Sequence, residues 1–154
     1  MEFPLRRYGV LKYQHVLVAV DLSPLTEQII SQAKQIADDS KALLSLVHVM
    51  EHSPVAYGGE FSIPVDVNLE QSLEKEVRGE LQKLGDKFQI PVDRQYLESG
   101  AVKLAVTDLA ESLHADLIVV GTHGHHGLDL LLGSRANAIL HRAQCDVLVI
   151  RVKE

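Results

Sequence analysis

The chain has 154 residues, 46% of them hydrophobic, which is enough to bury the core of one compact domain. Its net charge of −6 argues against a general binder of nucleic acid or of anionic membranes. No apolar run approaches the roughly 20 residues of a membrane helix, and residues 1–14 lack the apolar centre of a secretory signal. The single cysteine, Cys145, excludes an intrachain disulfide, so we expect a cytoplasmic protein.

Short apolar runs alternate with helical patterns along the chain. Residues 15–21, HVLVAVD, are typical of a strand that is buried on both faces. Ser23 and Pro24 are suited to the N-cap and the first turn of a following helix. The apolar residues of that helix recur at helical spacing: Leu25, Ile29, Ala33, Ile36 and Ala37. A second strand is predicted at 43–49, LLSLVHV.

The second half of the chain continues the alternation. Residues 67–88 form a predicted amphipathic helix whose apolar stripe consists of Leu69, Leu73, Val77, Leu81, Leu84 and Phe88. Residues 92–98 are more polar and alternate in character, which suits an edge strand. The remaining predicted elements are a helix after Gly100, a strand at 116–121, a helix from about Ser134 and a strand at 146–152.

This order of elements predicts a single α/β domain, with a parallel sheet and helices on both of its faces. We expect residues 1–13 to be an N-terminal extension and residues 14–154 to be the domain. Residues 51–67 contain two prolines and two glycines, which indicates a long loop. Such a loop is either a lid over a binding site or a disordered connection.

Glycine and histidine gather after the fourth predicted strand. Gly121, Gly124 and Gly127 allow successive backbone N–H groups to turn toward one point, as in an anion-binding loop. Gly133-Ser134 then opens a helix, whose N-terminus favours phosphate. Ligands of open α/β sheets bind at the carboxyl ends of the strands, so Asp21, at the end of the first strand, is expected nearby. The loop therefore indicates either a polyphosphate site or an ordinary turn that needs glycine.

Three established nucleotide motifs do not match this loop. A P-loop requires a lysine, which the loop lacks. The dinucleotide fingerprint follows the first strand, whereas these glycines follow the fourth. Residues 122–125, THGH, match the T-x-G-H of nucleotidyl transferases, but that signature also belongs after the first strand.

The histidines of the loop offer a metal site as an alternative. His123, His125 and His126 are so close in sequence that they cannot easily aim at one ion. No cysteine or carboxylate with the spacing of a zinc site accompanies them, so we assign no metal ligand. His48, in the second strand, is expected to be a hydrogen-bonded core histidine.

Several segments together resemble a universal stress protein. They are VLVAVDLSP around Asp21, LVHV at the end of the second strand, Ser99-Gly100, and residues 119–152. The resemblance covers residues 15–152. The ATP-binding branch of that family is associated with the pattern G-x₂-G-x₉-G-[ST]. This chain has all three glycines, with one residue fewer between the second and the third. A branch that lacks the glycines does not bind ATP, so the resemblance favours the ATP-binding type.

The resemblance implies a Rossmann-like, doubly wound sheet of five parallel strands in the order 3-2-1-4-5. It also implies that the chain binds ATP together with Mg or Mn. Asp21 would accept hydrogen bonds from the ribose or from the adenine edge. The nucleoside would lie against Ala19, Leu44 and Val120. The phosphates would be held by the loop and the following helix start, namely Gly121, His123, Gly124, Gly133, Ser134 and the backbone of Arg135.

The resulting functional hypothesis is an ATP-binding module of stress response or signalling. The resemblance implies a homodimer through the last strand, at 146–152. We expect an unidentified downstream protein partner to read the nucleotide-bound state. We expect neither a nucleic acid nor a membrane as a partner. One alternative is a slow ATP hydrolase at the same site, although no lysine or water-activating carboxylate lies within the loop and no catalytic residue is assigned. The other is a structural dimer without nucleotide.

Overall fold

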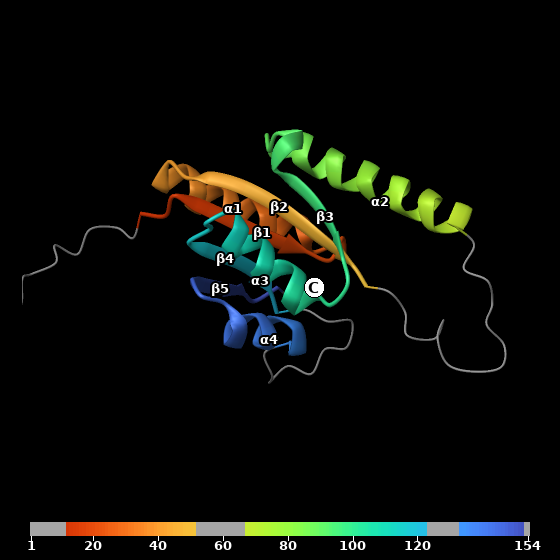
Figure 1. Cartoon of the computed structure of the whole chain (residues 1–154). Coiled ribbons are helices and arrows are strands. Elements are labelled where there is room, and N and C mark those ends of the chain that lie inside the picture. Colours follow the sequence, from red (N-terminus) through yellow and green to blue (C-terminus); the bar gives the residue numbers. More distant parts are fainter. Residues whose placement is uncertain (1–11, 52–66, 123–132, 153–154) are drawn as a thin grey trace, which may run out of the picture.

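The structure is a computed structural model that describes residues 12–51, 67–122 and 133–152 (Figure 1). Its elements are β1 (His15–Val20), α1 (Thr26–Ser40), β2 (Leu43–Met50), α2 (Val67–Lys87), the 3₁₀ turn η2 (Val92–Arg94), β3 (Gln95–Ser99), α3 (Val102–Ser112), β4 (Leu117–Gly121), α4 (Ser134–Arg142) and β5 (Asp146–Ile150). The predicted extension at 1–13 and the predicted loop at 51–67 fall almost entirely outside the described residues.

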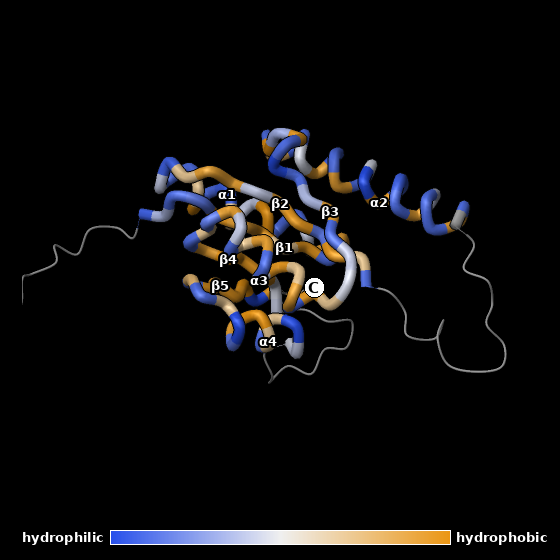
Figure 2. Tube along the Cα trace, viewed as in Figure 1, coloured by the Kyte–Doolittle hydropathy of each residue, from blue (hydrophilic) through white to orange (hydrophobic). Residues whose placement is uncertain are grey.

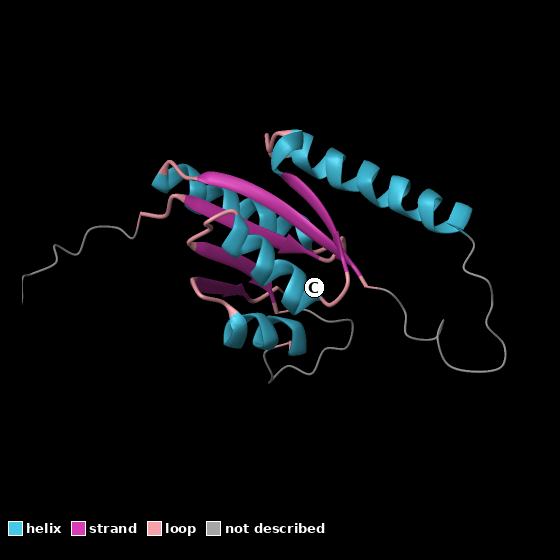
Figure 3. Ribbon diagram, viewed as in Figure 1, coloured by secondary structure: helices cyan, strands magenta, loops and turns pink. Residues whose placement is uncertain are grey.

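All five strands are parallel and form one sheet in the order β3-β2-β1-β4-β5. Helices cover both of its faces, as Figure 3 shows, so the predicted doubly wound α/β domain is confirmed. None of the described helices is long and apolar enough to cross a membrane.

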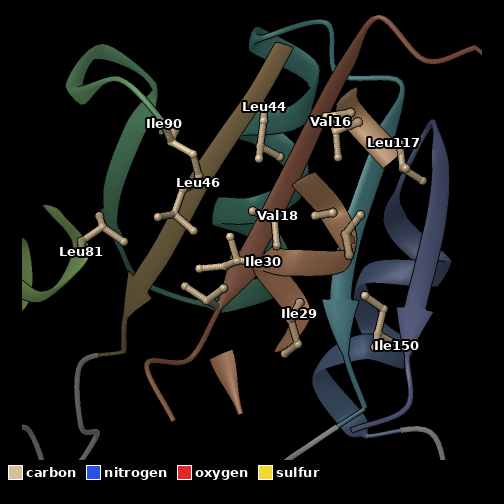
Figure 4. Close-up of a cluster of buried hydrophobic side chains, with 14 of the residues drawn as sticks. Val16, Val18, Ile29, Ile30, Leu44, Leu46, Leu81, Ile90, Leu117 and Ile150 are labelled. Atoms are coloured by element: carbon tan, nitrogen blue, oxygen red, sulfur yellow. The ribbon is translucent and has the colours of Figure 1, made fainter. Parts of the chain in front are cut away.

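Alternate residues of the strands enter two separate cores. Val16 and Val18 of β1 pack toward Ile29 and Ile30 of α1, on the face that α2 also covers (Figure 4). Leu17, between those valines, belongs to the other core, which α3 and α4 complete. Successive side chains of a strand point to opposite faces, and here both faces are covered, so the central strands are apolar throughout. In Figure 2 the central strands are coloured mainly as hydrophobic, whereas the helices alternate between hydrophobic and hydrophilic residues.

Two elements begin later than the sequence predicted. Ser23 does not cap α1, which starts at Thr26 with Leu25 in the N-cap position and no side-chain cap. The Asp21 carboxylate accepts a hydrogen bond from the Ser23 N–H at 3.0 Å and so holds this segment in a turn ahead of the helix. The edge strand starts at Gln95 because Val92–Arg94 form a 3₁₀ turn after Pro91.

The apolar stripe of α2 is only partly covered by the sheet. Leu81 is 2% exposed, whereas Leu69 and Leu73 are 58% and 46% exposed. The helix has 21 residues and is about 32 Å long at 1.5 Å per residue. The neighbouring strand β3 has 5 residues and spans only about 17 Å. The first turns of α2 therefore extend past the strand that its later turns cover (Figure 1).

Candidate functional site

The strands β1 and β4 part at the carboxyl end of the sheet. Their ladder has three pairs and ends with Val18 opposite Val119. On their outer sides, β1 stays paired with β2 as far as Val20, and β4 stays paired with β5 as far as Gly121. The strand order reverses between β1 and β4, which is where open α/β sheets bind ligands. We call this region, formed by residues 19–21 and 120–122, the switch-point edge.

Asp21 stands at this edge as a carboxylate. Its Oδ1 accepts hydrogen bonds from the Ser23 N–H at 3.0 Å and from the Thr26 hydroxyl at 3.4 Å. Partial burial raises the pKa of Asp21, but hydrogen bonds from Ser23 and Thr26 outweigh burial and hold the pKa below its ordinary value. Leu22, the next residue, has a φ of 60°, a left-handed conformation that turns the chain sharply behind the carboxylate. The edge therefore presents a fixed negative charge.

Two of the predicted nucleoside contacts lie at the switch-point edge. Ala19 and Val120 belong to the core on the α3 and α4 side of the sheet. Leu44 does not join them, because it pairs with Val16 near the amino end of β2 and packs on the opposite face. At about 3.3 Å per residue, the five steps from Val16 to Asp21 separate Leu44 from Asp21 by about 17 Å along the strand direction.

Val49 is a β2 residue near this edge that sequence reasoning did not single out. It lies near the carboxyl end of β2 and belongs to the same core as Ala19 and Val120. The pairing of Ala19 with Val47 sets this register, and the two-residue period of a strand then puts Val49 on the same face. Counting this two-residue period back from the end of LLSLVHVM would have indicated Val49 from the sequence.

Gly121 ends β4 and packs closely against α1. A Cβ at this position would lie 2.5 Å from Cδ1 of Ile29 and 3.2 Å from Cγ2 of Val152. Close packing against Ile29 of α1 therefore favours glycine here, independently of any phosphate. Thr122, which sequence reasoning also missed, extends the pairing with β5: its N–H donates to the Ile150 carbonyl at 2.9 Å. Its hydroxyl oxygen accepts from the Val152 N–H at 3.3 Å.

The helix α4 begins at the same end of the sheet without a side-chain cap. Gly133 occupies its N-cap position with φ −49° and ψ 142°, and the Ser134 hydroxyl does not cap the helix. Ser134 and Arg135 are both exposed in its first turn. The start of α4 therefore offers backbone N–H groups and a hydroxyl to an anion.

Arg135 forms an ion pair with Glu51, a residue that sequence reasoning did not single out. Nη2 of Arg135 contacts Oε2 of Glu51, which directly follows β2. The pair joins segments that are 84 positions apart in the chain, so no local sequence pattern could have indicated it.

The predicted phosphate ligands His123 and Gly124 lie outside the described residues, as do His125 and His126. Among the residues that the structure describes, no cluster of three or more histidine, cysteine or acidic side chains is arranged for a metal. His48 is half-buried, and its Nδ1 lies 2.8 Å from the Val20 carbonyl. Since a carbonyl only accepts, Nδ1 must carry the proton and donate it, as expected for a core histidine.

Comparisons with known proteins agree with this architecture. The pattern of the universal stress protein family matches residues 12–151. Universal stress protein A homolog 1 of Coxiella burnetii is 58% identical over 144 residues, which cover 94% of this chain and 100% of that protein. The solved structure of universal stress protein UspA from Lactobacillus plantarum has a TM-score of 0.66 and 26% identity, covering 91% of this chain and 99% of its own.

A further solved structure is that of a universal stress protein in complex with cAMP. It has a TM-score of 0.67 at 24% identity and covers 91% of this chain and 98% of its own. The family match spans nearly the whole chain, and the Coxiella protein is similar along its full length. The chain therefore belongs to the universal stress protein family.

Proposed function

We propose that the chain binds ATP at the switch-point edge and acts as a nucleotide-binding module in stress response or signalling. The observation that carries the proposal is the parting of β1 and β4 between the Asp21 carboxylate and the uncapped start of α4. A nucleotide needs acceptors for its ribose and donors for its phosphates, and these two features supply them. The universal stress protein in complex with cAMP supports an adenine nucleotide as the ligand of this fold.

Each end of the nucleotide has a group to receive it. In the proposed complex, Asp21 accepts hydrogen bonds from the ribose hydroxyls or from the adenine amine. Ala19 and Val120 provide apolar contact for the nucleoside, together with Val49 in place of Leu44. A carboxylate that keeps its charge at neutral pH suits this role, because charge-assisted hydrogen bonds are the stronger ones.

The phosphates extend toward the start of α4. Ser134 and the N–H groups of the first turn of α4 donate to phosphate oxygens, and Gly133 leaves room for their approach. Gly121, His123 and Gly124 complete the proposed phosphate loop, and Mg or Mn neutralises part of the phosphate charge. The last two of these residues enter the proposal from the family pattern alone.

We further propose a homodimer that pairs β5 of two copies. β5 is an edge strand of the sheet, and its apolar residues Val147, Leu148 and Val149 are half-buried within one chain. Exposed apolar edge strands promote unwanted pairing, so proteins normally cover them. Pairing of two β5 strands covers both edges, and an unidentified protein partner then reads the nucleotide state of the dimer.

Calorimetric titration with ATP, ADP, AMP and cAMP tests the proposal. Saturable binding of ATP with one site per chain is the expected result. Phosphate release measured over hours separates a binding module from a slow hydrolase, because only the hydrolase releases phosphate in proportion to protein concentration. A wild-type protein that binds none of the four nucleotides would be the structural dimer instead.

A further inference from the structure

The ion pair between Glu51 and Arg135 lies across the switch-point edge. Glu51 follows β2, and Arg135 belongs to the first turn of α4, which precedes β5. In the sheet, β1 and β4 lie between β2 and β5. The contact therefore passes the carboxyl ends of β1 and β4, where the proposed nucleotide would sit.

We propose that the Arg135 guanidinium is the side-chain ligand of the terminal phosphates, and that the Glu51 carboxylate competes with them for it. This inference rests on the proposed function and identifies what selects a polyphosphate there. A guanidinium presents a planar fork of donors that suits carboxylate and phosphate oxygens equally. The Glu51 carboxylate thus marks a position from which an anionic oxygen reaches Arg135.

The strength of the ion pair permits this exchange. The side chains of Arg135 and Glu51 are 51% and 44% exposed. Exposed pairs of this kind shift an equilibrium by only about two- to fivefold, because water screens the charges and both side chains lose freedom. A phosphate chain carries more charge than one carboxylate and is also held by the start of α4. The competition therefore lowers affinity without blocking the site.

The charges at this edge make Arg135 decisive for nucleotides with several phosphates. Asp21 and Glu51 are both carboxylates and repel a polyphosphate. Arg135 offsets that repulsion only for phosphates that extend to the start of α4. We therefore expect ATP to depend on Arg135 much more than AMP, whose single phosphate stays beside the ribose.

Calorimetric titration of ATP and AMP into four proteins tests the inference: the wild type, Glu51→Gln, Arg135→Gln and the double variant. We expect Glu51→Gln to tighten ATP binding about two- to fivefold, since the competing charge is gone. Arg135→Gln should weaken ATP binding at least about tenfold, the usual effect of a lost charge-assisted hydrogen bond, and AMP binding less than about twofold. In the double variant the gain from Glu51→Gln should be clearly smaller, because without Arg135 the substitution relieves only the repulsion between Glu51 and the phosphates and no longer ends a competition.

Asp108→Asn is the matched control. The Asp108 carboxylate pairs with Arg142 at the other end of α4 at 2.7 Å, and both side chains of this pair are exposed too. The substitution therefore removes one negative charge, as Glu51→Gln does, but far from the switch-point edge. ATP affinity of this variant should equal that of the wild type, and all variants should keep the wild-type unfolding midpoint.

A gain from Glu51→Gln that is equally large without Arg135, or that Asp108→Asn reproduces, would reflect general charge and refute the competition. Equal losses of affinity for ATP and for AMP in Arg135→Gln would refute the role of Arg135 as a ligand of the terminal phosphates. If the wild type binds ATP and Glu51→Gln changes nothing, the inference alone fails. If the wild type binds no nucleotide, the proposed function fails as well.

Discussion

Gly121→Ala separates a packing requirement from a ligand requirement at the end of β4. The added Cβ would lie 2.5 Å from Cδ1 of Ile29, well inside the distance that two carbon atoms tolerate. Because Cδ1 is the far end of the Ile29 side chain, Ile29 must turn this methyl group aside within the buried core. Overpacking of this kind costs about 1–3 kcal/mol of the free energy of unfolding. The backbone itself does not oppose alanine, because Gly121 is not among the residues with positive φ.

Ile29→Val removes the atom that clashes. By itself this substitution deletes one buried methyl group and costs about 0.5–1.5 kcal/mol. In the double variant, the contacts left to a Cβ at position 121 are Val152 Cγ2 at 3.2 Å and Ile29 Cγ1 at 3.4 Å. These contacts are tight but tolerable. The double variant should therefore lose less free energy of unfolding than the sum of the two single losses, which is about 1.5–4.5 kcal/mol. We expect a favourable coupling of at least about 0.5 kcal/mol.

Urea unfolding of the four proteins at one fixed protein concentration measures the coupling. The concentration is fixed because dimerisation would otherwise change the apparent stability. Strictly additive costs would refute the clash with Ile29 as the reason for glycine. Titration of ATP into the double variant then tests whether the ligand also requires glycine at position 121. A stable double variant with wild-type ATP affinity shows that the Cβ does not obstruct the phosphates.

Four further outcomes follow from the site, the sheet edge and the half-buried His15. Asp21→Ala should weaken ATP binding by about 1–3 kcal/mol. Gly133→Val should abolish ATP binding because the side chain blocks the approach of the phosphates, while the protein still folds because φ −49° and ψ 142° accommodate valine. Calorimetry checks both. Val149→Pro removes a ladder donor from β5 and should give monomers by light scattering at micromolar concentration. Burial lowers the pKa of His15, so its folded-state pKa lies below the unfolded value and stability should fall as pH drops below about 6.5. In urea unfolding, His15→Gln should reduce the dependence of stability on pH. A pH profile of stability that the substitution leaves unchanged would contradict this role of His15.

The order of elements and the faces of the strands could be predicted from the sequence, because both depend on local periodicity. Val16, Leu17 and Val18 are all apolar, which requires cover on both faces and hence helices on both sides. The order 3-2-1-4-5 came from the family resemblance and not from periodicity, since a parallel pattern alone does not set which strands are neighbours.

Segments distant in the sequence meet only in the tertiary structure, and there the local pattern carried no information. Leu44 and Val49 are equally apolar, and only the register against β1 shows which of them reaches the switch-point edge. The exposed stripe at Leu69 and Leu73 depends on how far β3 extends beside α2, which the amphipathic pattern of α2 does not contain. The pairing of Glu51 with Arg135 was decided in the same way, because two charged side chains 84 positions apart become partners only when strand order and helix packing bring them together.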